Sequence, residues 1–215
     1  MQRFRVDGDT ITFDDGGMNL LSSDALRELR EVVEGQARAP ILHWRMTRAA
    51  GADMSEMAEF SARDAEEFAR LGQETFSAIE RLPMLTIAHV DGDCFGGALD
   101  LILAFDLRFA SERSRFSHPG AKLGIVTGFG GTSRWRRVID SPNARRLFLA
   151  NPILSAQEAL DAGLIDAIGD PATQQPSNPA TIAFLKDLIR HRDSLTQSQL
   201  ALLAERLGAL YNLDK

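Results

Sequence analysis

Residues 85–106, LTIAHVDGDCFGGALDLILAFD, decide the fold class and the place of the candidate site. The first six of them, Leu85–Val90, form a short apolar run rich in β-branched residues, which is typical of a buried strand. Three glycines follow within residues 92–97, which indicates a loop that needs positive φ or a close backbone approach. Residues 98–106 are largely apolar on every side, so we expect a buried helix there.

A strand, a glycine loop and the start of a buried helix leave backbone N–H groups without acceptors. Such groups, at the positive end of a helix, suit an oxyanion, a carbonyl oxygen or a phosphate. Glycine-rich turns are also common connections without a chemical role. The stretch by itself leaves both interpretations open.

Composition restricts the class of protein more than its function. The chain has 215 residues, enough for one domain with a full core, or for a core plus a small appendage. Hydrophobic residues make up 44% of it and charged residues 25%, which is an ordinary composition for a globular protein. A net charge of −6 argues against general nucleic-acid binding. One cysteine, Cys94, excludes an intrachain disulfide and favours a reducing compartment. With no signal-peptide pattern and no apolar run that could span a bilayer, we expect a cytoplasmic protein without membrane or nucleic-acid partners.

Strand-like runs alternate with helical segments as far as residue 168, which predicts a mainly parallel α/β core. A proline-containing linker over residues 170–179 and two amphipathic helices over 181–192 and 195–213 follow. We therefore divide the chain into a core, residues 1–169, and a linker with a C-terminal helical segment, residues 170–215. The strands are predicted as a hairpin over 3–13 and at 41–46, 85–90, 106–110, 115–117 and 164–168, and the core helices at 25–35, 65–81, 98–106, 131–138, 143–149 and 156–163.

Four short motifs in register carry a resemblance to a known family between about residues 10 and 168. They are Ala50-Gly51-Ala52-Asp53-Met54, the loop over residues 91–97, residues 123–125 running into 128–132, and residues 154–159 with 162–165. In order and spacing the chain resembles the crotonase superfamily, the enoyl-CoA hydratase/isomerase family. The resemblance implies an α/β fold, a spiral of ββα units with C-terminal helices, that assembles as trimers or hexamers and binds acyl-CoA thioesters.

The resemblance also implies an oxyanion hole for the thioester oxygen, formed by the backbone N–H groups of Ala52 and Gly97. Backbone donors survive changes of side chain, so this half of the site looks intact. Coenzyme A would enter as part of the substrate, and neither a metal nor another cofactor is implied. Substrate-binding roles carry over to Ala50, Gly51, Asp53 and Gly96.

The acid–base half departs from the family pattern of two glutamates. The first matched position holds Asp100, whose stem is one methylene shorter, and the second holds Gly120, which has no side chain. Asp100 is a candidate base, and the alternative is a side chain that only hydrogen-bonds the loop. His118 could replace the missing glutamate because its pKa is ordinarily near neutral, or it could be a loop histidine without a role.

Three functions compete at this stage. The first is an enzyme that acts on acyl-CoA through an enolate, with Ala52, Gly97, Asp100 and His118 as its catalytic groups. The second is an acyl-CoA-binding or scaffold member of the family that has lost catalysis, which Gly120 favours. The third, a ClpP-like peptide hydrolase, needs a serine nucleophile, and the start of the helix after Gly97 holds none.

Overall fold

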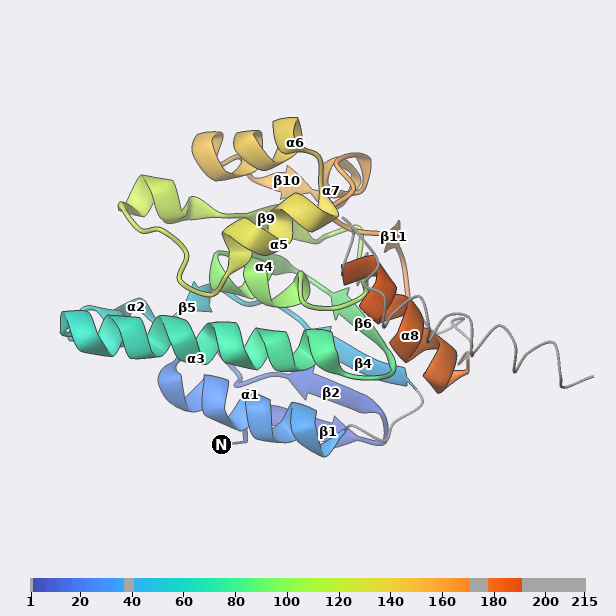
Figure 1. The fold of residues 1–215 in the computed structure, drawn as a ribbon. Helices are drawn as coiled ribbons and strands as arrows, with labels where there is room; N and C mark the ends of the chain where they lie inside the picture. The colour runs from blue at the N-terminus through green and yellow to red at the C-terminus, as the bar shows by residue number, and fades with distance from the viewer. Residues whose placement is uncertain (1, 37–40, 171–177, 191–215) are drawn as a thin grey trace, which may run out of the picture.

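A mainly parallel six-stranded sheet forms the core of the protein, as predicted (Figure 1). The computed structural model describes residues 2–36, 41–170 and 178–190. The β1–β2 hairpin is antiparallel, and the other neighbouring pairs in this sheet are parallel. In spatial order the strands are β1 (Phe4–Asp7), β2 (Thr10–Phe13), β4 (Ile41–Met46), β6 (Leu85–Val90), β8 (Leu107–Ala110) and β11 (Ala167–Ile168).

Two small sheets lie beyond the carboxyl ends of the central strands. One pairs β3 (Leu20–Leu21) with β5 (Gly51–Ala52), and the other joins β10 (Leu154–Ser155), β9 (Arg115–Ser117) and β7 (Asp93–Phe95). Ala49 bridges them, because its N–H donates to the Asp93 carbonyl at 2.7 Å and its carbonyl accepts from Phe95 N at 3.0 Å. The segment after β4 therefore runs beside the segment after β6.

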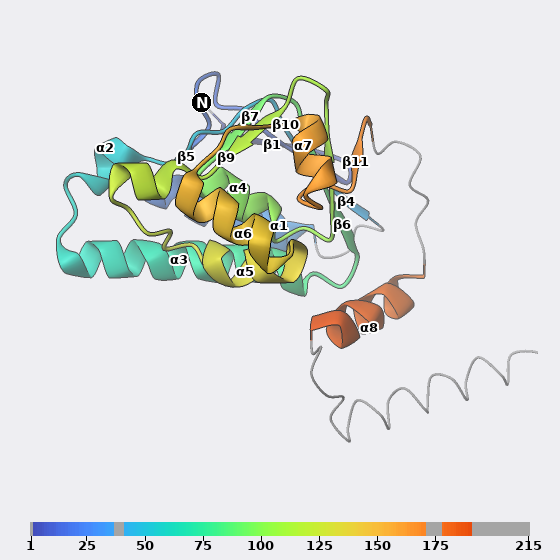
Figure 2. The ribbon, with the colours of Figure 1, turned by 90° about the horizontal axis from the view of Figure 1, so that it is seen from above.

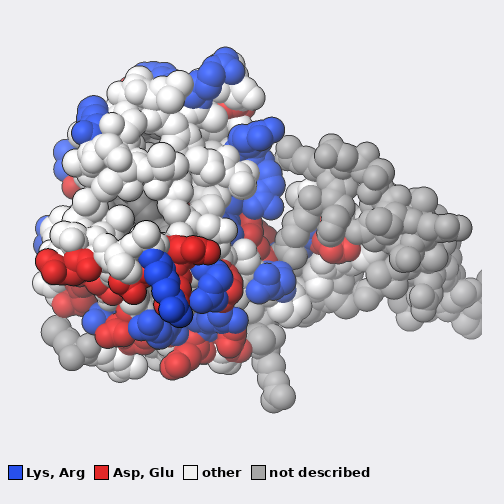
Figure 3. Space-filling view, turned by 60° about the vertical axis from the view of Figure 1, so that its left-hand side comes forward, with Lys and Arg blue, Asp and Glu red and all other residues white. Residues whose placement is uncertain are grey.

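Helices cover the sheet and form the outer layer. The two longest, α1 and α3, pack side by side, and arginine–carboxylate pairs cover their exposed sides, whereas much of the face above them is uncharged in Figure 3. The α-helices are α1 (Ser23–Gly35), α2 (Met54–Met57), α3 (Ala62–Arg81), α4 (Gly97–Ile102), α5 (Gly131–Val138), α6 (Ser141–Arg145), α7 (Ala156–Asp161) and α8 (Pro179–Arg190). Two irregular turns, η1 (Pro119–Leu123, 3₁₀) and η2 (Arg146–Ala150, π), complete the description.

Local signals explain most helix ends. The Ser22 hydroxyl caps α1 by accepting from Ala25 N, and Ser61 with Asp64 forms a capping box at α3. The prediction started α3 three residues late, because the apolar stripe begins after this polar first turn. A second capping box, Ser155 with Glu158, starts α7 as predicted.

Several predicted boundaries are wrong for tertiary reasons. The loop over residues 91–97 contains strand β7, which is formed by pairing with β9 and carries no local pattern. The buried helix over 98–106 ends at Ile102, residues 143–149 divide into α6 and η2, and only Ala167–Ile168 of residues 164–168 is strand. The helix over 181–192 is α8, whereas the linker over 171–177 and the helix over 195–213 lie outside the described residues.

Helix α8 lies to one side of the molecule (Figure 2). Lys186 attaches it to the sheet: its ammonium donates to the Met84 carbonyl at 2.9 Å and lies 2.7 Å from the Asp106 carboxylate. Among the described helices, none has the length and apolar character needed to cross a membrane.

Arg108 holds the end of the core together. It lies in β8 with only 7% of its surface exposed, and its guanidinium donates to the carbonyls of Leu164 and Phe105 and pairs with Asp166 at 3.1 Å. Burial lowers the pKa of this guanidinium, and the charges of Asp166 and Asp106 oppose the shift. The cation thus joins β8 to the segment that leads into β11.

We predict that Arg108→Met lowers the free energy of unfolding by about 2–3 kcal/mol, because buried carbonyls lose their donors. Urea titration measures the effect. The matched control is Arg113→Ala, which removes an exposed pair with Asp91 and should barely move the midpoint. Equal losses in the two variants would contradict a structural role for Arg108.

Candidate functional site

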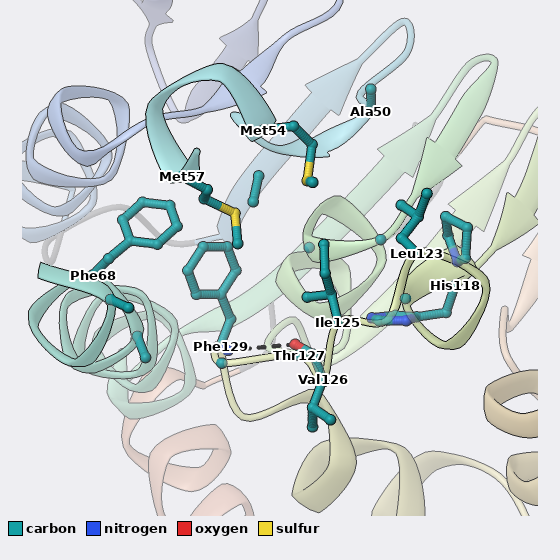
Figure 4. A pocket seen from close by; sticks show the side chains of 18 of the residues that line it. Ala50, Met54, Met57, Phe68, His118, Leu123, Ile125, Val126, Thr127 and Phe129 are labelled. Carbon is teal, nitrogen blue, oxygen red and sulfur yellow. Dashed lines mark hydrogen bonds between the residues drawn. The ribbon is translucent and has the colours of Figure 1, made fainter. Parts of the chain in front are cut away.

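An apolar pocket of about 280 Å³ lies between α2, α3 and the loop that follows β9 (Figure 4). Met54, Met57 and Phe68 lie on one side of it, and Leu123 and Ile125 lie on the other. Of the described side chains that line it, only those of His118 and Thr127 are polar, and His118 alone can titrate. The remaining lining residues are Ala50, Ala52, Phe60, Ala65, Ala69, Gly96, Gly97, Pro119, Gly120, Val126, Gly128 and Phe129.

Ala52 and Gly97 both line this pocket, each with a backbone N–H at the edge of a structural element. The Asp53 N–H donates to Leu21 of β3 at 3.2 Å, so the Ala52 N–H, one residue earlier in the extended chain, points to the opposite side. Gly97 is the first residue of α4, where an N–H has no acceptor within its own helix. Helix α4 has only six residues. Any attraction for an anionic or carbonyl oxygen here therefore comes from the individual N–H groups and not from the dipole of a long helix.

Glycine at position 51 permits the close approach of the two segments. Gly51 has φ +96°, and a Cβ there would lie 2.7 Å from Gly97 N and 2.8 Å from the Phe95 carbonyl oxygen. A Cβ on Gly97 would in turn lie 3.4 Å from Ala52 N. The contacts of Gly51 leave no room for a side chain between β5 and the start of α4, whereas the 3.4 Å separation at Gly97 is ordinary van der Waals contact.

Phe129 closes the inner end of the pocket. Its ring occupies the space that a Cβ on Gly72 of α3 would need, and it lies 2.8 Å from the Cβ position of Gly97. The ring makes edge-to-face contacts with Phe68 at 5.1 Å and Phe76 at 5.5 Å between centroids. The depth available to a ligand is therefore set by this aromatic cluster.

Asp100 lies behind the pocket wall and has no exposed surface. Its Oδ2 accepts a short hydrogen bond from the Thr127 hydroxyl and lies 3.4 Å from His118 Nε2, while its Oδ1 accepts from Trp135 Nε1 at 3.3 Å. A buried carboxylate is stable only when such donors compensate its desolvation. Asp100 is not among the described residues that line the pocket. It contacts two residues that do line it, His118 and Thr127.

Gly120 lines the pocket without contributing a functional group. A Cβ at this position would lie 2.7 Å from the Ile125 carbonyl oxygen, so the loop is folded around the absence of a side chain. The same Cβ position is 3.4 Å from both Nδ1 and Cε1 of His118. The imidazole is thus the side chain nearest to the place where the family pattern has its second glutamate.

Other candidates have local roles. Ala50 and Gly96 line the pocket with Ala52 and Gly97, but Asp53 does not, since its carboxylate caps α2 by accepting from Ser55 N and Glu56 N.

The Cys94 thiol is fully buried, and burial, followed by the charges of Asp100 and Asp93, raises its pKa well above the ordinary value. It is therefore a packed apolar residue rather than a nucleophile. No group of three or more metal-ligating side chains is found among the residues described here.

Sequence reasoning placed Phe129 and Gly131 in a family motif without giving either a role, and it missed Trp135. Gly131 and Trp135 are four residues apart in α5, so they share one face of that helix. A Cβ on Gly131 would overlap the Asp100 carboxylate, so the glycine makes room for the group that the tryptophan holds. The i, i+4 spacing could have paired these two residues, but nothing in it points to Asp100.

Comparisons with known proteins show the family to which this chain is similar. The family model for enoyl-CoA hydratase/isomerase matches residues 10–199. The chain is 35% identical over 162 residues to a short-chain-enoyl-CoA hydratase of Clostridium acetobutylicum, covering 72% of this chain and 62% of that protein. It is 33% identical over 166 residues to a crotonyl-CoA hydratase of Syntrophomonas wolfei, covering 74% and 64%. The solved structure of Pseudomonas aeruginosa DspI superposes with a TM-score of 0.86 at 27% identity, covering 97% of this chain and 94% of that one.

The chain therefore belongs to the enoyl-CoA hydratase/isomerase family, and the predicted crotonase-type α/β fold is confirmed. It spans a little under two thirds of the length of the two curated relatives. These similarities establish the family and the fold. They assign no role to any individual residue of the site.

We predict that Gly51→Ala destabilises the protein by at least about 2 kcal/mol, because it combines strain at positive φ with contacts that backbone atoms cannot relieve. Gly8→Ala is the matched control. Gly8 has φ +58° and open space around its Cβ position, so only the conformational cost, about 1 kcal/mol, is expected. Urea-induced unfolding compares the two, and the same small loss in both would show that β5 and α4 are not tightly packed.

Proposed function

We propose that this protein binds acyl-CoA thioesters and stabilises an enolate at the backbone N–H groups of Ala52 and Gly97. The observation that carries the proposal is the approach of these two amides at the wall of an apolar pocket. A thioester oxygen placed between them would accept both hydrogen bonds. Negative charge develops on this oxygen when an enolate forms, so fixed donors aimed at it lower the barrier, by roughly 100–1000-fold in rate for each donor.

The pocket suits the acyl part of such a substrate. Its walls are apolar side chains and glycine backbone, and apolar ligand surface buried there gains about 25 cal/mol per Å². The relatives are named for short-chain enoyl-CoA and crotonyl-CoA hydration, and we therefore propose hydration of a short enoyl-CoA as the first reaction to assay. In this proposal coenzyme A is part of the substrate, and the chemistry uses no separate cofactor.

An acyl-CoA-binding protein without turnover is the second candidate. It is favoured by Gly120, which leaves the pocket without the second carboxylate of the family pattern, and by the withdrawal of Asp100 behind the wall. Both candidates need the same binding site, so binding and turnover have to be measured separately. The peptide-hydrolase reading gains no support, because no serine is hydrogen-bonded to His118 in the described part of the chain.

We also propose that the protein assembles as a homo-oligomer, a trimer or hexamer as the family resemblance implies. Large apolar side chains are exposed, among them Val126 in the pocket wall with 83% of its surface accessible and Leu149 of η2 with 74%. Apolar surface of this kind favours burial against another chain. Light scattering in solution tests the proposal, and a monomer at all concentrations would contradict it.

Removing the carbonyl oxygen from the ligand tests whether the N–H groups of Ala52 and Gly97 bind it. Butyryl-CoA should bind about tenfold more tightly than its thioether analogue S-butyl-CoA, which keeps the chain and the coenzyme but lacks the carbonyl oxygen, since one or two hydrogen bonds of about 1 kcal/mol are lost. Isothermal calorimetry compares the two dissociation constants. Equal affinities would exclude thioester recognition at these amides, and no binding of butyryl-CoA at millimolar concentration would exclude the whole proposal.

A further inference from the structure

Among the described residues that line the pocket, one side chain, that of His118, can carry a proton. Neither Asp100 nor any other carboxylate is among its described lining residues, and Thr127, the other polar side chain, uses its hydroxyl hydrogen on Asp100. His118 lines the pocket with 5% of its surface exposed, and its Nε2 lies 3.4 Å from Asp100 Oδ2. Any proton transfer in this pocket by a protein side chain must therefore involve the imidazole.

The two edges of this imidazole have different surroundings. Nε2 faces the Asp100 carboxylate at 3.4 Å, a length typical of a catalytic hydrogen bond before substrate tightens it. Nδ1 makes no hydrogen bond among the described residues and faces the side-chain-free position of Gly120. The carboxylate favours the tautomer with hydrogen on Nε2, which leaves the lone pair of Nδ1 on the side of the pocket.

The Asp100 carboxylate is itself held in place. Trp135 Nε1 fixes Oδ1, the Thr127 hydroxyl shares Oδ2 with the histidine, and Gly131 leaves the space that both oxygens occupy. The Phe148 ring, 5.0 Å from the imidazole and 4.8 Å from the Trp135 ring between centroids, packs against both. These contacts restrict the rotation of the imidazole and of the carboxylate together.

We infer that His118 is the single proton carrier of this enzyme, acting through Nδ1, and that Asp100, Trp135 and Thr127 are positioning residues. The inference rests on the proposed function. Nδ1 takes the α-proton of a bound acyl-CoA; the C–H electron pair forms the carbon–carbon double bond of the enolate, and the carbonyl π pair moves to the oxygen at the two amides. The imidazolium, with Nε2–H directed at Asp100, then returns a proton to the α-carbon.

One carrier is also sufficient for hydration. Nδ1 accepts a proton from water while the water oxygen bonds to the β-carbon, and the imidazolium then delivers that proton to the α-carbon of the enolate. Atoms and charge balance without a second acid. This route makes the absence of a side chain at Gly120 compatible with catalysis.

The test follows exchange of the α-protons of butyryl-CoA in deuterated water by NMR, with calorimetry of the same ligand in parallel. His118→Ala should slow the exchange by at least about 100-fold while the dissociation constant of butyryl-CoA stays within about threefold. Added imidazole should restore part of the rate. His43→Ala, which removes a histidine of β4 outside the pocket, is the matched control and should exchange at the unmodified rate.

The possible outcomes separate acyl-CoA binding from the role assigned to His118. Absence of butyryl-CoA binding by the unmodified protein overturns the proposed function and this inference together. Binding without exchange overturns the inference and the enolate part of the proposed function, and leaves an acyl-CoA-binding protein. Exchange that persists in His118→Ala overturns the inference alone and requires a different base.

The positioning roles of Asp100 and Trp135 are tested with a measurement that a simple loss of packing would not change. Asp100→Asn and Trp135→Phe should lower kcat for crotonyl-CoA hydration by about 10-fold or more with little change in KM, and ¹⁵N NMR should show His118 losing its Nε2–H tautomer. An unaltered tautomer in Asp100→Asn, or a loss confined to KM, would overturn their assigned role.

Discussion

The close approach of strand β5 to the first residue of α4 is the constraint on which the site depends. Two amides can converge on one ligand atom only if their chains come together with no side chain between them. Gly51 provides this, since a Cβ there would lie 2.7 Å from Gly97 N and 2.8 Å from the Phe95 carbonyl oxygen. The main sheet sets the approach by placing β4 beside β6, so that their carboxyl ends open at the same edge.

The second feature of the site is a buried carboxylate, that of Asp100, which does not line the pocket. With one methylene less than glutamate, Asp100 stays behind the wall and contacts His118 and Thr127 instead of the pocket. A buried carboxylate beside an imidazole is the arrangement that orients a general base elsewhere in enzymes. The chain thus has an acidic residue, Asp100, at the position of the first glutamate of the family pattern, while His118 is the titratable side chain that lines the pocket among the described residues.

Local sequence signals predicted the parts of the fold that local interactions determine. Short apolar runs predicted β4 and β6, and the helix predicted over residues 25–35 is α1, which starts two residues earlier. Strand β7 was missed because its stability comes from pairing with β9, and the length of α4 was overestimated because apolar composition does not show where a buried helix ends. The Trp135–Asp100 contact joins residues 35 positions apart, so no spacing rule reveals it. Positions 52 and 97 could be named only through the family resemblance.

Backbone amides can be observed one by one, which gives the central claim its most direct measurement. In ¹H–¹⁵N spectra of the protein titrated with butyryl-CoA, the amide protons of Ala52 and Gly97 should move downfield as they hydrogen-bond the thioester oxygen. With S-butyl-CoA, which has no carbonyl oxygen, the same two signals should stay close to their unliganded positions. Identical shifts with both ligands, or no shift at Ala52 and Gly97 while other pocket residues respond, would contradict the account.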